Sequence, residues 1–410
     1  MDFIKNYFKK HTWFFCIFLF ILFYNLIAVG VNPWNSTNVY YSFYLIDFSF
    51  GFCTKILPGA IYNFLFDDTS PGTAYTYNVI LFVLLIALVA YILERLIMSF
   101  EKENRKTLIF ILLFFVSGPL TFSLLAQVPG TYDYYWLLFA TLSLLCLSDK
   151  KLYIFIIPLS LLAVITNYGY LIVQLPFLLL LMIYKSALLN DEKSRIFLRL
   201  IAVITLIMSF SLGLYFVFFE NANLVYSKEE CVEIFRERGF TGEPDYFLIT
   251  LYNDDFFNVM ENDFDEKVFA SAQSPIEYSL LTLYLRIKLA IEKIHIKSAI
   301  IPLMLASPCV SLFFVYFRKK VKEERNKTKK LTLLCFIPVS VAVIIFSMFL
   351  SMDIIRFIGH SFILLFTSFL YVLYNEKDVE YIRKTIKKVP VFLTLFYIAF
   401  YLVTIMSPIE

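Results

Sequence analysis

Three polar side chains late in the chain have the spacing of a single helical face. Asp353, Arg356 and His360 follow one another at intervals of three and four residues within an apolar stretch, which places them on one side of an α-helix. Arg356 could hold a phosphate through two parallel hydrogen bonds, and His360, one turn further on, could donate to the same anion or relay a proton. The structural alternative is an Asp353–Arg356 ion pair that caps the helix, with His360 packed against a neighbour.

Asp47 is the one acidic residue between residues 32 and 66, a stretch rich in Tyr, Phe, Asn and Gly. A carboxylate in apolar, partly dry surroundings has a raised pKa, which brings it towards the range of a general base. The sequence therefore predicts Asp47 as a catalytic base with a raised pKa. The alternative is a helix N-cap in front of Phe48.

Further polar candidates for substrate binding lie at turns between apolar segments. They are Lys55, Asp133, Tyr134, Asn167 and Tyr168. Capping of the helix that follows is the bland alternative for Asp133 and for Asn167. The many Tyr and Trp residues near these turns are typical of an interfacial aromatic belt, and aromatic rings also stack on sugars.

The elements that must position these residues are apolar helices. Of the 410 residues, 60% are hydrophobic and 17% are charged, whereas soluble domains have roughly 45–50% apolar and about 25% charged residues. This excludes a soluble enzyme, and the small net charge of +3 gives no reason to expect a nucleic-acid partner. We predict an all-α polytopic integral membrane protein with about eleven transmembrane helices. They are expected near residues 13–31, 77–98, 108–128, 134–148, 152–167, 170–184, 197–219, 298–317, 331–350, 356–374 and 390–406.

Lysine and arginine residues predict the orientation of these helices. Basic residues gather in alternate short connections, most densely between residues 318 and 330, and such connections remain in the cytoplasm. We therefore expect a cytoplasmic N-terminus, a C-terminus outside and a single membrane domain over residues 1–410. The basic runs themselves are expected to be solvated.

Two long segments are then extracytoplasmic. Residues 32–76 form the first loop, and residues 220–296 form a large acidic insertion with helical periodicity at 227–238 and 276–294. Cys53 and Cys231 fall in these segments and could form a disulfide, with two buried thiols as the alternative. No cofactor is certain. A divalent cation on the acidic residues of the insertion stays open, although its acidic strings lack the Gly of a calcium loop.

The first loop also carries a resemblance. The string Asp47-x-x-x-Gly51-Phe52-x-x-Lys55-x-Leu57-x-Gly59, with about eleven spans and polar residues at the outer face, resembles GT-C-type glycosyltransferases and polytopic proteins of bacterial surface-polysaccharide assembly. The resemblance implies an enzyme of the bacterial plasma membrane that moves a sugar from a polyprenyl-phosphate carrier to a glycan or lipid-linked acceptor. It implies Asp47 as the catalytic carboxylate, with Arg356 and Lys55 on the carrier phosphate. This chain has Lys55 and Asn167-Tyr168 where the family pattern has Arg and a His-Glu pair.

Two other functions remain open. A polymerase that joins lipid-linked oligosaccharides at the same face would use outer-face arginines, for which Arg236, Arg238 and Arg356 are the candidates. A flippase or transporter of lipid-linked glycans, which is not an enzyme, would need ionisable residues deep in several spans. Glu94 and Arg95 near one end of a predicted span and His360 near the end of another are the few residues of that kind.

Overall fold

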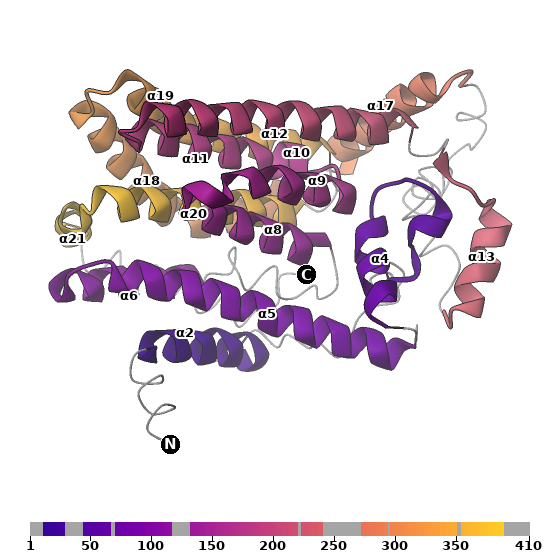
Figure 1. Ribbon diagram of the computed structural model, residues 1–410, viewed down its shortest axis with the longest axis horizontal. Coiled ribbons are helices and arrows are strands. Elements are labelled where there is room, and N and C mark those ends of the chain that lie inside the picture. Colours follow the sequence, from indigo (N-terminus) through magenta and orange to yellow (C-terminus); the bar gives the residue numbers. More distant parts are fainter. Residues whose placement is uncertain are drawn as a thin grey trace.

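The computed structural model describes residues 11–28, 44–66, 70–116, 132–219, 223–240, 272–293, 296–350 and 354–388. Within these ranges every regular element is a helix, as the sequence predicts. Most helices lie side by side with their axes roughly parallel in Figure 1. The all-α class is therefore confirmed for the described part of the chain.

The first half of the chain contributes the following elements: α2 (Thr12–Phe23), η1 (Tyr24–Ala28), η2 (Phe48–Phe50), α4 (Ile56–Leu65), α5 (Pro71–Met98), α6 (Lys102–Val116), α8 (Tyr132–Cys146), η3 (Lys150–Phe155), α9 (Ile156–Thr166), α10 (Tyr170–Val173) and α11 (Leu175–Leu188). The second half contributes α12 (Glu192–Phe219), α13 (Lys228–Glu237), α17 (Pro275–Lys293), α18 (Ile296–Glu323), α19 (Lys327–Leu350), α20 (Ile354–Glu376) and α21 (Val379–Ile386).

Four of the described helices are long and apolar enough to cross a membrane. They cover Pro71–Met98, Glu192–Phe219, Lys327–Phe346 and Ile358–Glu376. Three shorter apolar helices cover Thr12–Leu26, Ile56–Leu65 and Leu175–Leu188. Helices of this length and composition identify a membrane protein.

Several predicted segments differ in detail from the helices observed. The predicted span 152–167 begins with the 3₁₀ turn η3, and the span 170–184 is interrupted at Gln174 between α10 and α11. The first loop contains α4, which the sequence does not predict. Helices α13 and α17 confirm the two helical stretches of the insertion. The last predicted span, 390–406, lies outside the described residues.

The helix bundle has two distinct ends. In Figure 1, α4 and α13 lie at the right, while α21 and the turn between α18 and α19 lie at the left. We call the first the Asp47 end, because Asp47 immediately precedes η2 there, and the second the basic end, because it carries the lysines of residues 318–330.

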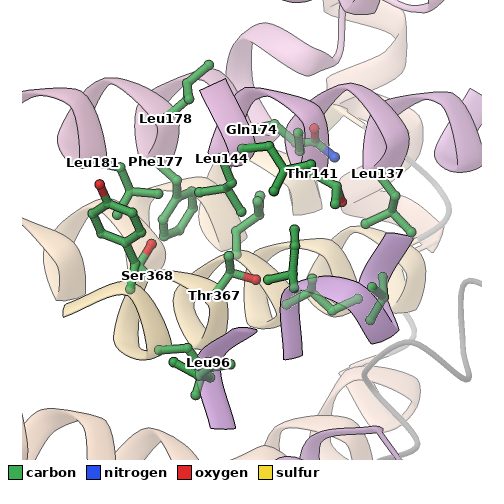
Figure 2. A pocket seen from close by; sticks show the side chains of 18 of the residues that line it. Leu96, Leu137, Thr141, Leu144, Gln174, Phe177, Leu178, Leu181, Thr367 and Ser368 are labelled. Atoms are coloured by element: carbon green, nitrogen blue, oxygen red, sulfur yellow. The ribbon is translucent and has the colours of Figure 1, made fainter. Parts of the chain in front are cut away.

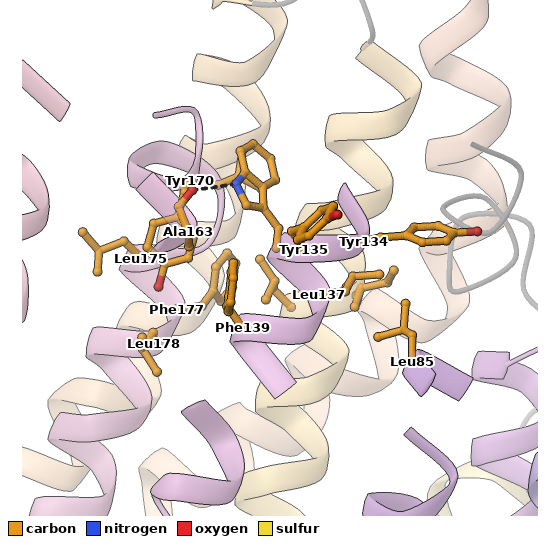
Figure 3. Packing of buried hydrophobic residues seen from close by; sticks show 14 of the residues in the cluster. Leu85, Tyr134, Tyr135, Leu137, Phe139, Ala163, Tyr170, Leu175, Phe177 and Leu178 are labelled. Atoms are coloured by element: carbon orange, nitrogen blue, oxygen red, sulfur yellow. Dashed lines mark hydrogen bonds between the residues drawn. The ribbon is translucent and has the colours of Figure 1, made fainter. Parts of the chain in front are cut away.

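Large buried aromatic side chains fill the bundle between these ends. Trp136 is fully buried, and its indole Nε1 donates a hydrogen bond of 3.1 Å to the carbonyl of Ala163, joining α8 to α9. Tyr135 and Phe139 of α8 belong to one buried cluster with Tyr170 of α10 and Phe177 of α11 (Figure 3). This packing fixes the helices that carry the polar candidates.

Three lysines of the basic end, Lys319, Lys320 and Lys329, are not simply solvated, contrary to the prediction, whereas Lys322, Lys327 and Lys330 are exposed. Lys320 is buried, with its ammonium 2.9 Å from Asp378, while Lys329 lies 2.7 Å from Glu376. Lys319 also contacts Asp378, at 2.5 Å. These ion pairs join α18, α19 and α20 to the turn before α21. The reason for the difference is that acids distant in the sequence are brought to the lysines by helix packing.

Candidate functional site

Asp47 lies at the start of the 3₁₀ turn η2, with both carboxylate oxygens engaged. Its Oδ1 accepts hydrogen bonds from the amide of Ser49 at 2.9 Å and from the Ser49 hydroxyl at 2.6 Å. Its Oδ2 accepts from Nδ2 of Asn63 in α4, at 2.7 Å. The N-cap alternative is therefore present locally, although Asn63 and a further donor add contacts that a cap does not need.

The further donor is Arg238, which follows α13. One terminal guanidinium nitrogen of Arg238 donates to Oδ2 of Asp47 at 3.1 Å and to the carbonyl of Leu45 at 2.5 Å. The other lies 3.4 Å from the Ser49 hydroxyl. The guanidinium also lies over the ring of Phe50, 5.4 Å from its centroid. Both charged side chains remain partly exposed, Arg238 at 24% and Asp47 at 20%.

These contacts lower the pKa of Asp47, so the predicted rise is wrong. Partial burial alone would raise the pKa, but the hydrogen bonds from Ser49 outweigh it, together with the positive charge of Arg238 and the amide of Asn63. Each of these partners stabilises the ionised carboxylate. The residues next to Asp47 in the sequence are largely apolar, whereas its donors in α4 and after α13 come from distant parts of the chain.

A cluster of aromatic side chains packs the segment of residues 223–240 against the first loop. The ring of Phe50 packs against Tyr226 and Phe235, with centroid distances of 5.3 Å and 5.5 Å. The amide of Val225 donates to the carbonyl of Phe50 at 3.1 Å. The two long segments of the sequence therefore meet, and Arg238 is held over Asp47.

A second polar pair lies inside the bundle, near its Asp47 end. Asp133 in the first turn of α8 and His360 in α20 are joined by a contact of 2.6 Å between Oδ1 and Nε2. Both side chains are 1% exposed. The ring of Trp136 meets the imidazole edge-on, with centroids 5.5 Å apart. Asp133 thus binds an imidazole across the bundle instead of only capping its own helix.

The remaining candidates have mostly structural contacts. Lys55 has a left-handed backbone, φ 68°, and its amide donates to the carbonyls of Ile165 and Thr166 at the end of α9. Asn167 accepts from the amide of Gly169 at 2.8 Å, which closes the turn between α9 and α10. Tyr134 is buried against Phe82, and Tyr168 packs half-buried on the core.

Two candidates lie wholly or partly outside the described residues. Asp353 is outside them, whereas Arg356 lies in α20 with its side chain outside them. The structure therefore brings together Asp133 with His360 and Asp47 with Arg238. Arg238 was a candidate only for a polymerase. Its position at the end of the predicted helical stretch 227–238 gave no sign that it contacts Asp47.

The possible disulfide and the possible cation site involve different parts of the two long segments. Cys53 and Cys231 are both fully buried. Within the described ranges no group of three His, Cys, Asp or Glu side chains could hold a metal ion. The acidic stretch considered for a cation falls in residues 241–271, which lie outside these ranges.

Comparisons of the whole chain with protein-family models, with curated proteins and with solved structures found no match.

Proposed function

We propose that this protein is a membrane-embedded glycosyltransferase of the bacterial plasma membrane that acts at the outer face. It would transfer a sugar from a polyprenyl-phosphate carrier to a cell-envelope glycan or lipid-linked acceptor, as the resemblance to GT-C-type enzymes implies. The observation that supports this most is the contact between the Asp47 carboxylate and the Arg238 guanidinium. Transfer from a lipid phosphate needs both a base for the acceptor and a cation for the leaving phosphate.

The proposed topology places the Asp47 end outside and the basic end in the cytoplasm, with about eleven spans. The ion-paired lysines of the turn between α18 and α19 then lie on the inner side, in agreement with the positive-inside rule. The candidate base, Arg238 and the Asp133–His360 pair all fall towards the outer side.

In the proposed reaction Asp47 takes the proton of an acceptor hydroxyl, whose oxygen attacks the anomeric carbon. The bond from that carbon to the carrier phosphate breaks, and the phosphate leaves with the electron pair. Arg238 binds the departing phosphate oxygens through its planar donors. When Arg238 turns from Asp47 to the phosphate, the pKa of Asp47 rises, because one of the charges that lowers it has been removed. Arrival of the carrier would thereby activate the base.

Asp47→Asn tests this assignment. We expect the variant to insert and fold but to lose at least about a hundredfold in sugar transfer, the lower range for loss of a general base. The assay follows radiolabelled sugar from a polyprenyl-phosphate donor in proteoliposomes.

Asp149→Asn is the matched control, because Asp149 also caps a 3₁₀ turn, accepting from the amide of Lys151 at 3.0 Å, but at the basic end. Full activity of Asp47→Asn, or equal losses in both variants, would exclude Asp47 as the base.

A repeat-unit polymerase is the second candidate, and the position of Arg238 beside Asp47 favours it, since outer-face arginines are what that function requires. The two candidates differ in the donor. Proteoliposomes supplied separately with a single-sugar carrier and with a lipid-linked oligosaccharide should consume the first if the protein is a transferase, and should lengthen the second if it is a polymerase.

A further inference from the structure

A cavity of ≈ 200 Å³ lies between α5, α8, α10, α11 and α20, separate from the Asp47–Arg238 contact. Its walls are mainly leucine side chains, among them Leu144 and Leu181, which Figure 2 shows facing the same space as Phe177. Arg95 also lines the cavity. Two of these helices, α5 and α20, are among those able to cross a membrane. The cavity is therefore an apolar space within the membrane-spanning part of the molecule.

Polar atoms without partners interrupt these apolar walls. Gln174 is 1% exposed, and within the described structure neither its amide nitrogen nor its amide oxygen has a hydrogen-bond partner. The hydroxyl of Ser368, which is fully buried, is likewise unpartnered there. Both residues line the cavity, as Figure 2 shows. A buried polar group without a partner costs about 1–3 kcal/mol, so such atoms facing one cavity indicate a ligand that can hydrogen-bond.

The Asp133–His360 pair lies just beyond the cavity, towards the Asp47 end. Leu137 lines the cavity and follows Asp133 by one helical turn on α8, and Leu364 lines it one turn after His360 on α20. Because Nε2 of His360 faces Asp133, only Nδ1 remains for another group, and it has no partner among the described residues. In the neutral tautomer that donates from Nε2 to Asp133, Nδ1 is a hydrogen-bond acceptor. A ligand hydroxyl at this end of the cavity would donate to it.

We propose that the cavity binds a long-chain alcohol from the membrane, a lipid whose polar end is an uncharged hydroxyl. The hydrocarbon chain packs closely against Leu144, Phe177 and Leu181. These contacts take the place of the contacts that the chain makes with lipid in the membrane. The hydroxyl lies at the end of the cavity nearest His360 and Gln174. It donates a hydrogen bond to Nδ1 of His360 and accepts one from the amide nitrogen of Gln174. Apolar walls disfavour a carboxylate or phosphate at the same place, because a buried charge without a charged partner is costly. This site is independent of sugar transfer.

Photolabelling of the full chain in lipid nanodiscs tests the site. Three probes share one hydrocarbon chain with a photoreactive diazirine and differ only at the end, which is a primary alcohol, its methyl ether or a carboxylic acid. We expect the alcohol to label residues of the cavity, located by mass spectrometry, about tenfold more than either analogue, since one hydrogen bond to a buried acceptor is worth about 1.4 kcal/mol. Equal labelling by the alcohol and its ether would overturn the assignment of a hydroxyl.

Three substitutions, one of them a control, locate the effect. Leu144→Trp fills the cavity and should abolish labelling by the alcohol, whereas Ile207→Trp, at an exposed position on α12, should leave it unchanged. Gln174→Leu keeps the approximate size of the side chain and should reduce the excess of labelling by the alcohol over labelling by the ether.

If Leu144→Trp does not fold, an excess of unlabelled alcohol added to the unaltered protein must suppress the cavity label instead. Labelling that neither Leu144→Trp nor the competitor reduces would overturn the proposal, whatever the outcome of the sugar-transfer assays.

Discussion

At the scale of single residues, two aspartates with the same local role differ in what the rest of the chain brings to them. Asp47 and Asp149 each cap a 3₁₀ turn and accept a hydrogen bond from the amide two residues later. Only Asp47 also receives Asn63 and Arg238. The extra donors lower the pKa of Asp47, and one of them is a partly exposed arginine, so Asp47 has contacts that its role as a cap does not require.

The contact between Arg238 and Asp47 should also hold the segment of residues 223–240 in place. Arg238→Gln removes charge-assisted hydrogen bonds, each worth about 1.5–3 kcal/mol when buried and less at this partly exposed pair. We expect faster backbone amide hydrogen exchange across α13, at the level of severalfold, measured by mass spectrometry on the protein in nanodiscs.

Arg236→Gln is the matched control for this prediction. Arg236 has the same charge, lies two residues earlier and is exposed, so its loss should leave the exchange unchanged. Equal exchange in both variants would show that the guanidinium of Arg238 contributes nothing to the attachment.

At the scale of elements, the attachment between the first loop and residues 223–240 depends on a close approach of two backbones. Gly51 has φ +107°, and a Cβ added there would lie 1.9 Å from the carbonyl oxygen of Asn223. Both the positive φ and the close approach require glycine. The flanking Phe50 can then reach Tyr226 and Phe235, so the aromatic cluster depends on the glycine beside it.

Gly51→Ala should therefore destabilise the protein, by about 1–3 kcal/mol for the left-handed backbone strain alone, with more from the clash. Gly72→Ala is the control, because a Cβ at Gly72 meets nothing within 4 Å and Gly72 lies in the first turn of α5. Alanine there should be neutral or slightly stabilising. The thermal midpoint of the detergent-purified variants measures both changes, and a Gly51→Ala midpoint equal to that of Gly72→Ala would show that this backbone contact is not formed.

At the scale of the whole molecule, the two ends of the bundle differ in the kind of polar contact they hold. The basic end ties its helices with lysine–carboxylate pairs, and Glu376 also accepts a hydrogen bond of 2.6 Å from the hydroxyl of Tyr184. The Asp47 end has an arginine–aspartate pair near the surface and a histidine–aspartate pair inside. An excess of basic residues at one end and mixed polar groups at the other are what an oriented membrane protein requires.

Reporter insertions test the orientation that this difference implies. Green fluorescent protein inserted in the turn at residues 324–326 should fluoresce in bacterial cells, because that turn is expected in the cytoplasm. Alkaline phosphatase inserted after residue 240 should be active, because it folds only after export. The reverse pattern at both positions would invert the proposed topology and place Asp47 inside the cell.

The sequence by itself determined the helical class, the approximate positions of most helices and the uneven distribution of basic residues. These follow from apolar runs and from charge, which act within a segment or along the membrane normal and need no knowledge of neighbours. It also singled out Asp47, Asp133 and His360 as polar residues worth explaining. The prediction of one span over residues 170–184 missed the break at Gln174, although Pro176 at the start of α11 marks it in the sequence.

Only the tertiary structure decided which polar residues meet. Asp47 and Arg238 are separated by 191 positions, and Asp133 and His360 by 227, so nothing in the local pattern of either partner indicates the other. The pKa of Asp47 followed from those partners and moved in the direction opposite to the one that its apolar neighbours predict. Hydrogen bonds and ion pairs act over a few ångströms, and packing of distant segments sets those distances.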